Sequence, residues 1–277
     1  MFDIPFVDSV FHPTDLSDAS SHAFAHALAI ALHRQSRFTI LHATQDSENW
    51  MQFPSIQTTL RRWGLLSESS DGTSIFNKLD INVEKISLQS THPLKAIIDY
   101  LKTKPSDLIV LATEGREGLA RWIRPSIAER IAHQTETKTL FVPNKCRGFV
   151  SYDTGKVLLK KILIPVDFHP SPSSAIEYAA RAAKYVGGKV EITLCHIGKD
   201  WKMSSLILPD HEDITWIKKN CTGNIVEKIT EMAAAQEIDL LVMPTAGHDG
   251  VFDALRGSVT EKVLRHAPCP LLAVPTN

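Results

Sequence analysis

The chain has 277 residues, of which 43% are hydrophobic and 22% are charged, and its 30 basic and 31 acidic residues give a formal net charge of −1. This length favours two domains, because one domain usually spans about 100 to 200 residues. The balanced charge argues against nucleic-acid binding. The sequence has no run of about 20 apolar residues and no start that resembles a signal peptide, so we predict a cytoplasmic protein that does not bind membranes.

In the first half, residues 10–32 and 107–143 contain apolar strand-like runs followed by segments with helical spacing, and residues 47–66 have room for another helix. His22, His26 and His33 lie on the first helix-like segment. None of the 12 histidines falls in HExxH or a comparable spacing, so a solvated or packed helix face is favoured over a metal site.

The second half alternates strands and helices more clearly. Apolar runs predict strands over residues 160–168, 189–197, 239–245 and 270–275, and helical spacing predicts helices over residues 171–188, 223–236 and 258–267. Residues 198–213 carry Pro209 and little periodicity, which predicts a loop. Strands that alternate with helices predict right-handed crossovers and a parallel sheet covered on both faces.

The two halves are one pattern repeated. When residues 10–32 are set under residues 162–184, Pro13 and Asp15 fall over Pro165 and Asp167, and residues 107–143 align with residues 239–275 without a gap. We therefore predict an α/β protein of two repeated doubly wound domains. Their expected bounds are residues 1–146 and 147–277, with the polar stretch 144–156 as a linker.

The cysteines show no spacing typical of a metal or redox site. They are far apart, without a CxxC pair, so we predict reduced thiols, two of them in core strands; the four are Cys146, Cys195, Cys221 and Cys269.

The segment 247–258, GHDGVFDALRGS, follows a predicted strand and leads into a predicted helix, a position where open parallel sheets bind ligands. Gly247, Gly250 and Gly257 let the backbone approach a ligand closely, and Ser258 either caps the helix or bonds to a phosphate oxygen. The segment lacks both GK[ST] and GxGxxG. A phosphate-binding loop and a simple turn are the two alternatives.

Asp167 ends the first strand of the second half, at the same predicted edge of the sheet. A carboxylate there is suited to accept hydrogen bonds from ribose hydroxyls. The equally weighted alternative is an N-cap for the helix that follows.

Three stretches of the second half resemble the universal stress protein family: ILIPVDF at residues 162–168, LCHI at residues 194–197, and GHDGVFDALRGSVTEKVLRHAPCPLLAVP at residues 247–275. The resemblance extends over residues 10–143 and 160–275, as in members that carry two such domains in tandem. It implies a five-stranded parallel sheet in each domain, of the adenine-nucleotide-binding kind. It also implies that the final strands serve self-association, as a pseudo-dimer or a homodimer.

ATP-binding members of this family carry G-2x-G-9x-G-[S/T]. Counted back from Gly257, the pattern falls on Gly247 and then on Pro244, where the first glycine should be. The resemblance implies that Asp167 contacts the ribose and Ile197 the adenine. It places around the phosphates Gly247, Gly257, Ser258 and Val259. Gly250 is a further predicted site residue, because a glycine there lets the backbone approach a ligand. In the first half the same count reaches Pro125, which removes an N–H donor and predicts that this domain binds no nucleotide.

We favour a non-catalytic stress-response protein that binds ATP or another adenine nucleotide in the second domain, with no metal beyond the magnesium that accompanies a nucleotide. No general base in a recognisable triad is present, so an enzymatic role is disfavoured. One alternative is an interaction scaffold that binds no nucleotide, favoured by Pro125 and Pro244. The other is a slow nucleotide hydrolase in which Asp167 or His248 positions water.

Overall fold

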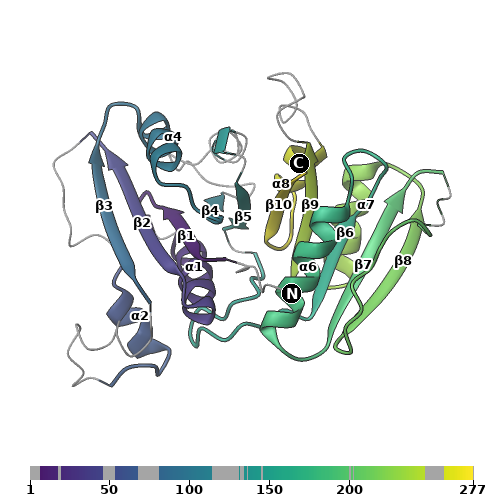
Figure 1. The fold of residues 1–277 in the computed structure, drawn as a ribbon, viewed down its shortest axis with the longest axis horizontal. Helices are drawn as coiled ribbons and strands as arrows, with labels where there is room; N and C mark the ends of the chain where they lie inside the picture. The colour runs from purple at the N-terminus through teal and green to yellow at the C-terminus, as the bar shows by residue number, and fades with distance from the viewer. Residues whose placement is uncertain are drawn as a thin grey trace.

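The computed structural model describes residues 7–17, 20–45, 54–67, 81–113, 131, 134–135, 137–144, 146–199, 201, 203–246 and 259–276. These residues form a 10-stranded sheet in the order β3-β2-β1-β4-β5-β10-β9-β6-β7-β8 (Figure 1). The first-half strands are β1 (Ser9–Pro13), β2 (Arg37–Thr44), β3 (Val83–Gln89), β4 (Leu108–Thr113) and β5 (Lys138–Pro143). The second-half strands are β6 (Lys161–Pro165), β7 (Val190–Ile197), β8 (Ile214–Cys221), β9 (Leu240–Ala246) and β10 (Leu271–Thr276).

Both halves have the same strand order, and every strand pair within a half is parallel. The prediction of two repeated α/β units, each with a five-stranded parallel sheet, is therefore confirmed. The halves meet where β5 and β10 pair antiparallel, with Leu272 opposite Leu140. That pairing joins the two parallel sheets into one continuous sheet.

Helices cover both faces of the sheet, each packed on its own layer of core side chains (Figure 1). One face carries α1 (Ser21–Arg34), α2 (Ile56–Arg62) and α6 (Ser173–Val186), and the other carries α4 (Pro93–Thr103), α7 (Ile225–Ala235) and α8 (Val259–Leu264). Successive strand residues such as Val10 and Phe11 are fully buried and belong to opposite layers. This double burial explains why the strands are continuous apolar runs rather than alternating ones. None of the helices described here is long and apolar enough to cross a membrane.

The two halves differ between their second and third strands, as the sequence predicts. The first half has the helix α2 within residues 47–66, whereas the described part of residues 198–213 contains neither helix nor strand. The indole Nε1 of Trp216 donates a hydrogen bond to the carbonyl oxygen of Pro209 at 3.0 Å, which ties this segment to β8.

The stretch 144–156 is more than a linker, contrary to the sequence-based expectation. Phe149 is buried, and its ring meets the His26 ring edge-on at a centroid distance of 4.7 Å. The indole Nε1 of Trp63 donates to the carbonyl oxygen of Tyr152 at 2.8 Å. Apolar and aromatic residues inside an otherwise polar stretch therefore pack it against the first half.

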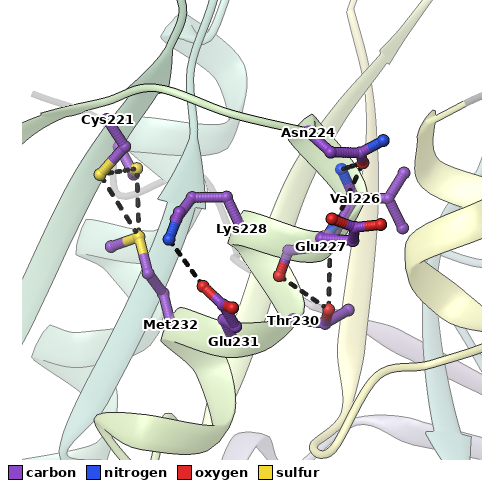
Figure 2. A network of polar contacts seen from close by, with 9 residues as sticks. Cys221, Asn224, Val226, Glu227, Lys228, Thr230, Glu231 and Met232 are labelled. Carbon is purple, nitrogen blue, oxygen red and sulfur yellow. Dashed lines mark hydrogen bonds and ion pairs between the residues drawn. The ribbon is translucent and has the colours of Figure 1, made fainter.

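Asn224 caps the helix α7, and its removal provides a test of local stability. Its side-chain Oδ1 accepts hydrogen bonds from the amides of Val226 at 3.0 Å and Glu227 at 3.2 Å (Figure 2). We expect Asn224→Ala to lower the free energy of unfolding by about 1 kcal/mol, because two amides of the first turn lose their acceptor. Urea unfolding measures the change. Asn224→Ser keeps an acceptor and should stay close to the parent; an equal loss in both variants would contradict the capping role.

Candidate functional site

A crevice opens in each half at the carboxyl edge of the sheet, where two neighbouring strands separate. β6 pairs with β9 only at Ile162 with Leu240 and at Leu163 with Leu241, and β1 pairs with β4 over an equally short stretch. Beyond those pairs the strands diverge, at the point where the strand order reverses. Such switch points are the usual ligand sites of open parallel sheets.

The second-half crevice holds a cavity of about 240 Å³. Its walls are mostly apolar and come from the ends of β6, β7 and β9, from α7 and from the start of α8. Among its lining residues are Asp167, Ile197, Ile229, Met243, Pro244 and Val259.

The structure brings three of the predicted site residues together. Asp167, Ile197 and Val259 all line this one cavity, although they come from different parts of the second half. Their role in binding stays a prediction. The four other predicted residues lie outside the described part of the chain; they are Gly247, Gly250, Gly257 and Ser258.

Pro244 also lines the cavity, and its position explains why a proline is tolerated within a strand. It lies in β9 opposite Val274 of β10, beyond the last residue of β9 that pairs with β6. The side of β9 that faces the crevice therefore needs no ladder hydrogen bond from residue 244.

Asp167 does not cap the following helix, so that alternative is wrong. The helix α6 begins at Ser173 with Pro172 at the N-cap, too far along the chain for the Asp167 side chain. Instead, Asp167 Oδ1 accepts a hydrogen bond from the amide of Phe168 at 2.8 Å, and 56% of the side chain is exposed. An ionised carboxylate accepts about four hydrogen bonds, so this group retains capacity for a ligand.

An aromatic cluster beside Asp167 was not found from the sequence. Phe168 and Trp201 lie with their ring centroids 4.5 Å apart, and His196 meets Trp201 edge-on at 5.4 Å. His196 Nδ1 lies 3.1 Å from the carbonyl oxygen of Val166 and 3.9 Å from Asp167 Oδ1. Since Phe168 is 60% exposed, the cluster presents an aromatic ring to solvent next to a carboxylate. The only sequence signal was an aromatic residue directly after Asp167.

The first half has an equivalent site that differs in detail. Pro13 pairs with Leu41 in the first half, and the equivalent Pro165 pairs with Cys195 in the second half. Leu41 and Cys195 are therefore equivalent. The residues that follow them are equivalent as well, so His42 corresponds to His196 and Ala43 to Ile197. The cavity here measures about 750 Å³, and the small Ala43 side chain in place of an isoleucine contributes to the larger space.

The two equivalent aspartates are engaged differently. Asp15 Oδ1 accepts hydrogen bonds from both the amide of Ser17 at 3.0 Å and its hydroxyl at 2.6 Å. Asp15 is also less exposed than Asp167. The Asp15 carboxylate therefore accepts more local hydrogen bonds than the Asp167 carboxylate and has less capacity left for a ligand.

Comparison with known proteins agrees with this architecture. The model of the universal stress protein family matches residues 8–143 and 207–275. Universal stress protein MJ0531 of Methanocaldococcus jannaschii is 29% identical over 143 residues, which cover 43% of this chain and 84% of that protein.

Two solved structures share the fold over almost the whole chain. A universal stress protein from Archaeoglobus fulgidus superposes with a TM-score of 0.64 at 16% identity, covering 98% of this chain and 97% of that one. The functionally unknown protein PA1789 from Pseudomonas aeruginosa gives a TM-score of 0.62 at 14% identity, covering 97% of this chain and 92% of that one. With a family match to both halves and the repeated sheet, the chain belongs to the universal stress protein family.

Proposed function

We propose that this protein is a cytoplasmic stress-response protein that binds an adenine nucleotide such as ATP in the second-half cavity and acts by binding rather than by catalysis. The observation that carries the proposal is the exposed carboxylate of Asp167 at a cavity walled by Ile197 and Val259. The equivalent carboxylate of Asp15 is already bonded to Ser17.

The chemistry of the cavity suits the parts of a nucleotide. The apolar walls formed by Ile197, Ile229 and Met243 suit a planar base, and the Asp167 carboxylate suits the hydroxyls of a ribose. In the sequence, the glycine-rich segment 247–258 directly precedes Val259, the first residue of α8, which favours this segment as the phosphate contact.

The proposal treats the chain as an intramolecular pseudo-dimer. β5 and β10 pair with each other, so the inner edges of the two sheets are satisfied within one chain. With one competent half, the expected stoichiometry is one nucleotide per chain.

Calorimetric titration with ATP, ADP and AMP tests the proposal, together with mass spectrometry of any ligand that copurifies. We expect Asp167→Ala to weaken binding by about 10- to 100-fold, because charged hydrogen bonds of about 1.5–3 kcal/mol are lost. Gly257→Pro, which copies Pro125 of the first half, should abolish binding.

The first half supplies the matched control. Asp15→Ala changes the equivalent residue and should leave the affinity and the stoichiometry unchanged. If Asp15→Ala weakens nucleotide binding while Asp167→Ala does not, the nucleotide binds in the first half and the assignment to the second half is wrong. If the parent releases no heat with any of the three nucleotides and carries none after purification, the proposal fails and the scaffold alternative replaces it.

A further inference from the structure

Three sulfur atoms meet on the α7 side of the second-half sheet. Cys195 Sγ lies 3.7 Å from Cys221 Sγ and 3.4 Å from Met232 Sδ, and Cys221 Sγ lies 3.8 Å from the same Met232 Sδ. Figure 2 shows Cys221 and Met232 with dashed lines that close this triangle. We call these three residues the sulfur triangle.

The fold brings the sulfur triangle together from three elements. The register of β7 and β8 pairs Ile197 with Cys221 and Cys195 with Lys219, so the two cysteines are diagonal neighbours on the same sheet face. Met232 reaches them from α7. Cys195 and Met232 are buried, whereas Cys221 is partly exposed at the carboxyl edge and provides a route for an ion from solvent.

A disulfide is a poor description of this arrangement. The sulfurs of a disulfide are about 2.05 Å apart, and its α-carbons are usually within about 6.8 Å, whereas diagonal residues on neighbouring strands are farther apart, at about 7–8 Å. A disulfide would also make no use of Met232. In contrast, sulfur ligands about 2.3 Å from one metal ion lie about 3.7 to 4.0 Å from one another. The two distances from Cys221 Sγ fall in this range, and the Cys195 Sγ–Met232 Sδ distance of 3.4 Å must lengthen slightly when an ion binds.

The donor set selects the class of metal. Thiolate and thioether sulfurs are soft ligands and favour Cu(I), whereas structural zinc sites use four nitrogen or sulfur ligands. Across the described part of the chain, no three or more histidine, cysteine or acidic side chains gather as a zinc site requires.

Two lysines near the triangle affect the charge of the site. Burial disfavours the Cys195 thiolate, and the positive charges of Lys219 and Lys228 favour it. Both thiols lose their protons to solvent on metal binding, so a monovalent ion leaves a site with one net negative charge. Lys219 partly offsets that charge, whereas Lys228 is already paired with Glu231 at 2.6 Å.

We propose that Cys195, Cys221 and Met232 bind one Cu(I) ion. The proposal rests on the three sulfur positions and on the soft character of the donors. It is independent of nucleotide binding, because it uses none of the residues assigned to the nucleotide.

Anaerobic titration of the full chain with Cu(I) in the presence of the chromophoric chelator bathocuproine disulfonate tests the proposal. The parent should withdraw one equivalent of copper from the chelator. X-ray absorption of the loaded protein should show a first shell of sulfur only. A parent that withdraws no copper, or a first shell that contains nitrogen or oxygen, would overturn the proposal.

Variants identify the ligands. Cys221→Ser should abolish copper uptake. Met232→Leu nearly conserves the side-chain volume and should weaken copper binding by at least about tenfold, because losing even a residue that only supports a metal ligand costs that much. Met203→Leu, which alters another buried methionine of the second half, and the Cys146→Ser/Cys269→Ser double variant should bind like the parent. Circular dichroism checks that each variant folds. Retention of parental affinity in folded Cys221→Ser would show that the assignment is wrong.

Discussion

Acidification from pH 6.5 to pH 4 is expected to lower the free energy of unfolding by about 3 kcal/mol for each of two buried histidines, His12 and His26. His12 Nδ1 lies 2.9 Å from the carbonyl oxygen of Val110, and His26 Nδ1 lies 2.7 Å from that of His22. Because a carbonyl only accepts, Nδ1 carries the hydrogen and Nε2 is the atom that would gain a proton. Both Nε2 atoms are buried without a hydrogen-bond partner among the described residues.

The direction of the effect follows from the two pKa values. Burial lowers the pKa of His12 and His26 from 6.5 to about 4 in the native state, whereas the unfolded chain keeps ordinary values. Between these values the unfolded state binds protons that the native state does not, so stability falls by about 1.4 kcal/mol per pH unit for each histidine. The stabilisation is complete above pH 6.5 and is lost as the pH falls toward 4.

Urea unfolding at a series of pH values measures this loss. His12→Asn and His26→Asn keep an N–H donor near the position of Nδ1 but do not titrate. The difference in free energy of unfolding between the parent and each variant should therefore shrink or change sign as the pH falls. His92→Asn, at an exposed residue, is the control and should leave the pH profile unchanged. Parallel profiles for the parent and the two buried-site variants would refute the prediction.

Asp239→Ala is expected to lower the free energy of unfolding by about 3 kcal/mol, because it leaves two partly buried backbone donors without their acceptor and removes the buried partner of an ion pair. Asp239 is 5% exposed, and its Oδ2 accepts hydrogen bonds from the amides of Lys160 at 2.8 Å and Lys161 at 2.9 Å. Its Oδ1 pairs with the guanidinium of Arg147. One carboxylate thus anchors the start of β6 and the stretch between the two halves.

The repeat supplies a matched control for Asp239. In the first half, Asp107 Oδ2 accepts from the amides of Asp8 at 3.0 Å and Ser9 at 2.9 Å and from the Ser9 hydroxyl at 2.8 Å, but Asp107 is exposed. Asp107→Ala should therefore cost only about 1 kcal/mol, because water replaces the lost acceptor. Asp239→Asn keeps one oxygen acceptor and should fall between the parent and Asp239→Ala. Equal losses at both aspartates in urea unfolding would contradict the role given to burial.

The strands and helices were predictable because they depend on local patterns. Short stretches carry these patterns, as in the apolar run that forms β6 and the helical spacing of residues 223–236. The match of residues 107–143 to residues 239–275 predicted that both halves share one fold. The sequence also singled out Asp167, but it left two roles open. Only the position of the α6 N-cap at Pro172 removed one of them.

By itself, the sequence thus determined the family, the α/β class and the repeated unit. The tertiary structure decided that β5 and β10 join the halves, that Phe149 packs on His26, and that the sulfur triangle exists. Cys195 and Cys221 are distant in sequence and meet because the parallel register of β7 and β8 makes them diagonal neighbours. Periodicity determines which residues share a face of one element, but the contacts between elements depend on register and packing, which come from the whole chain.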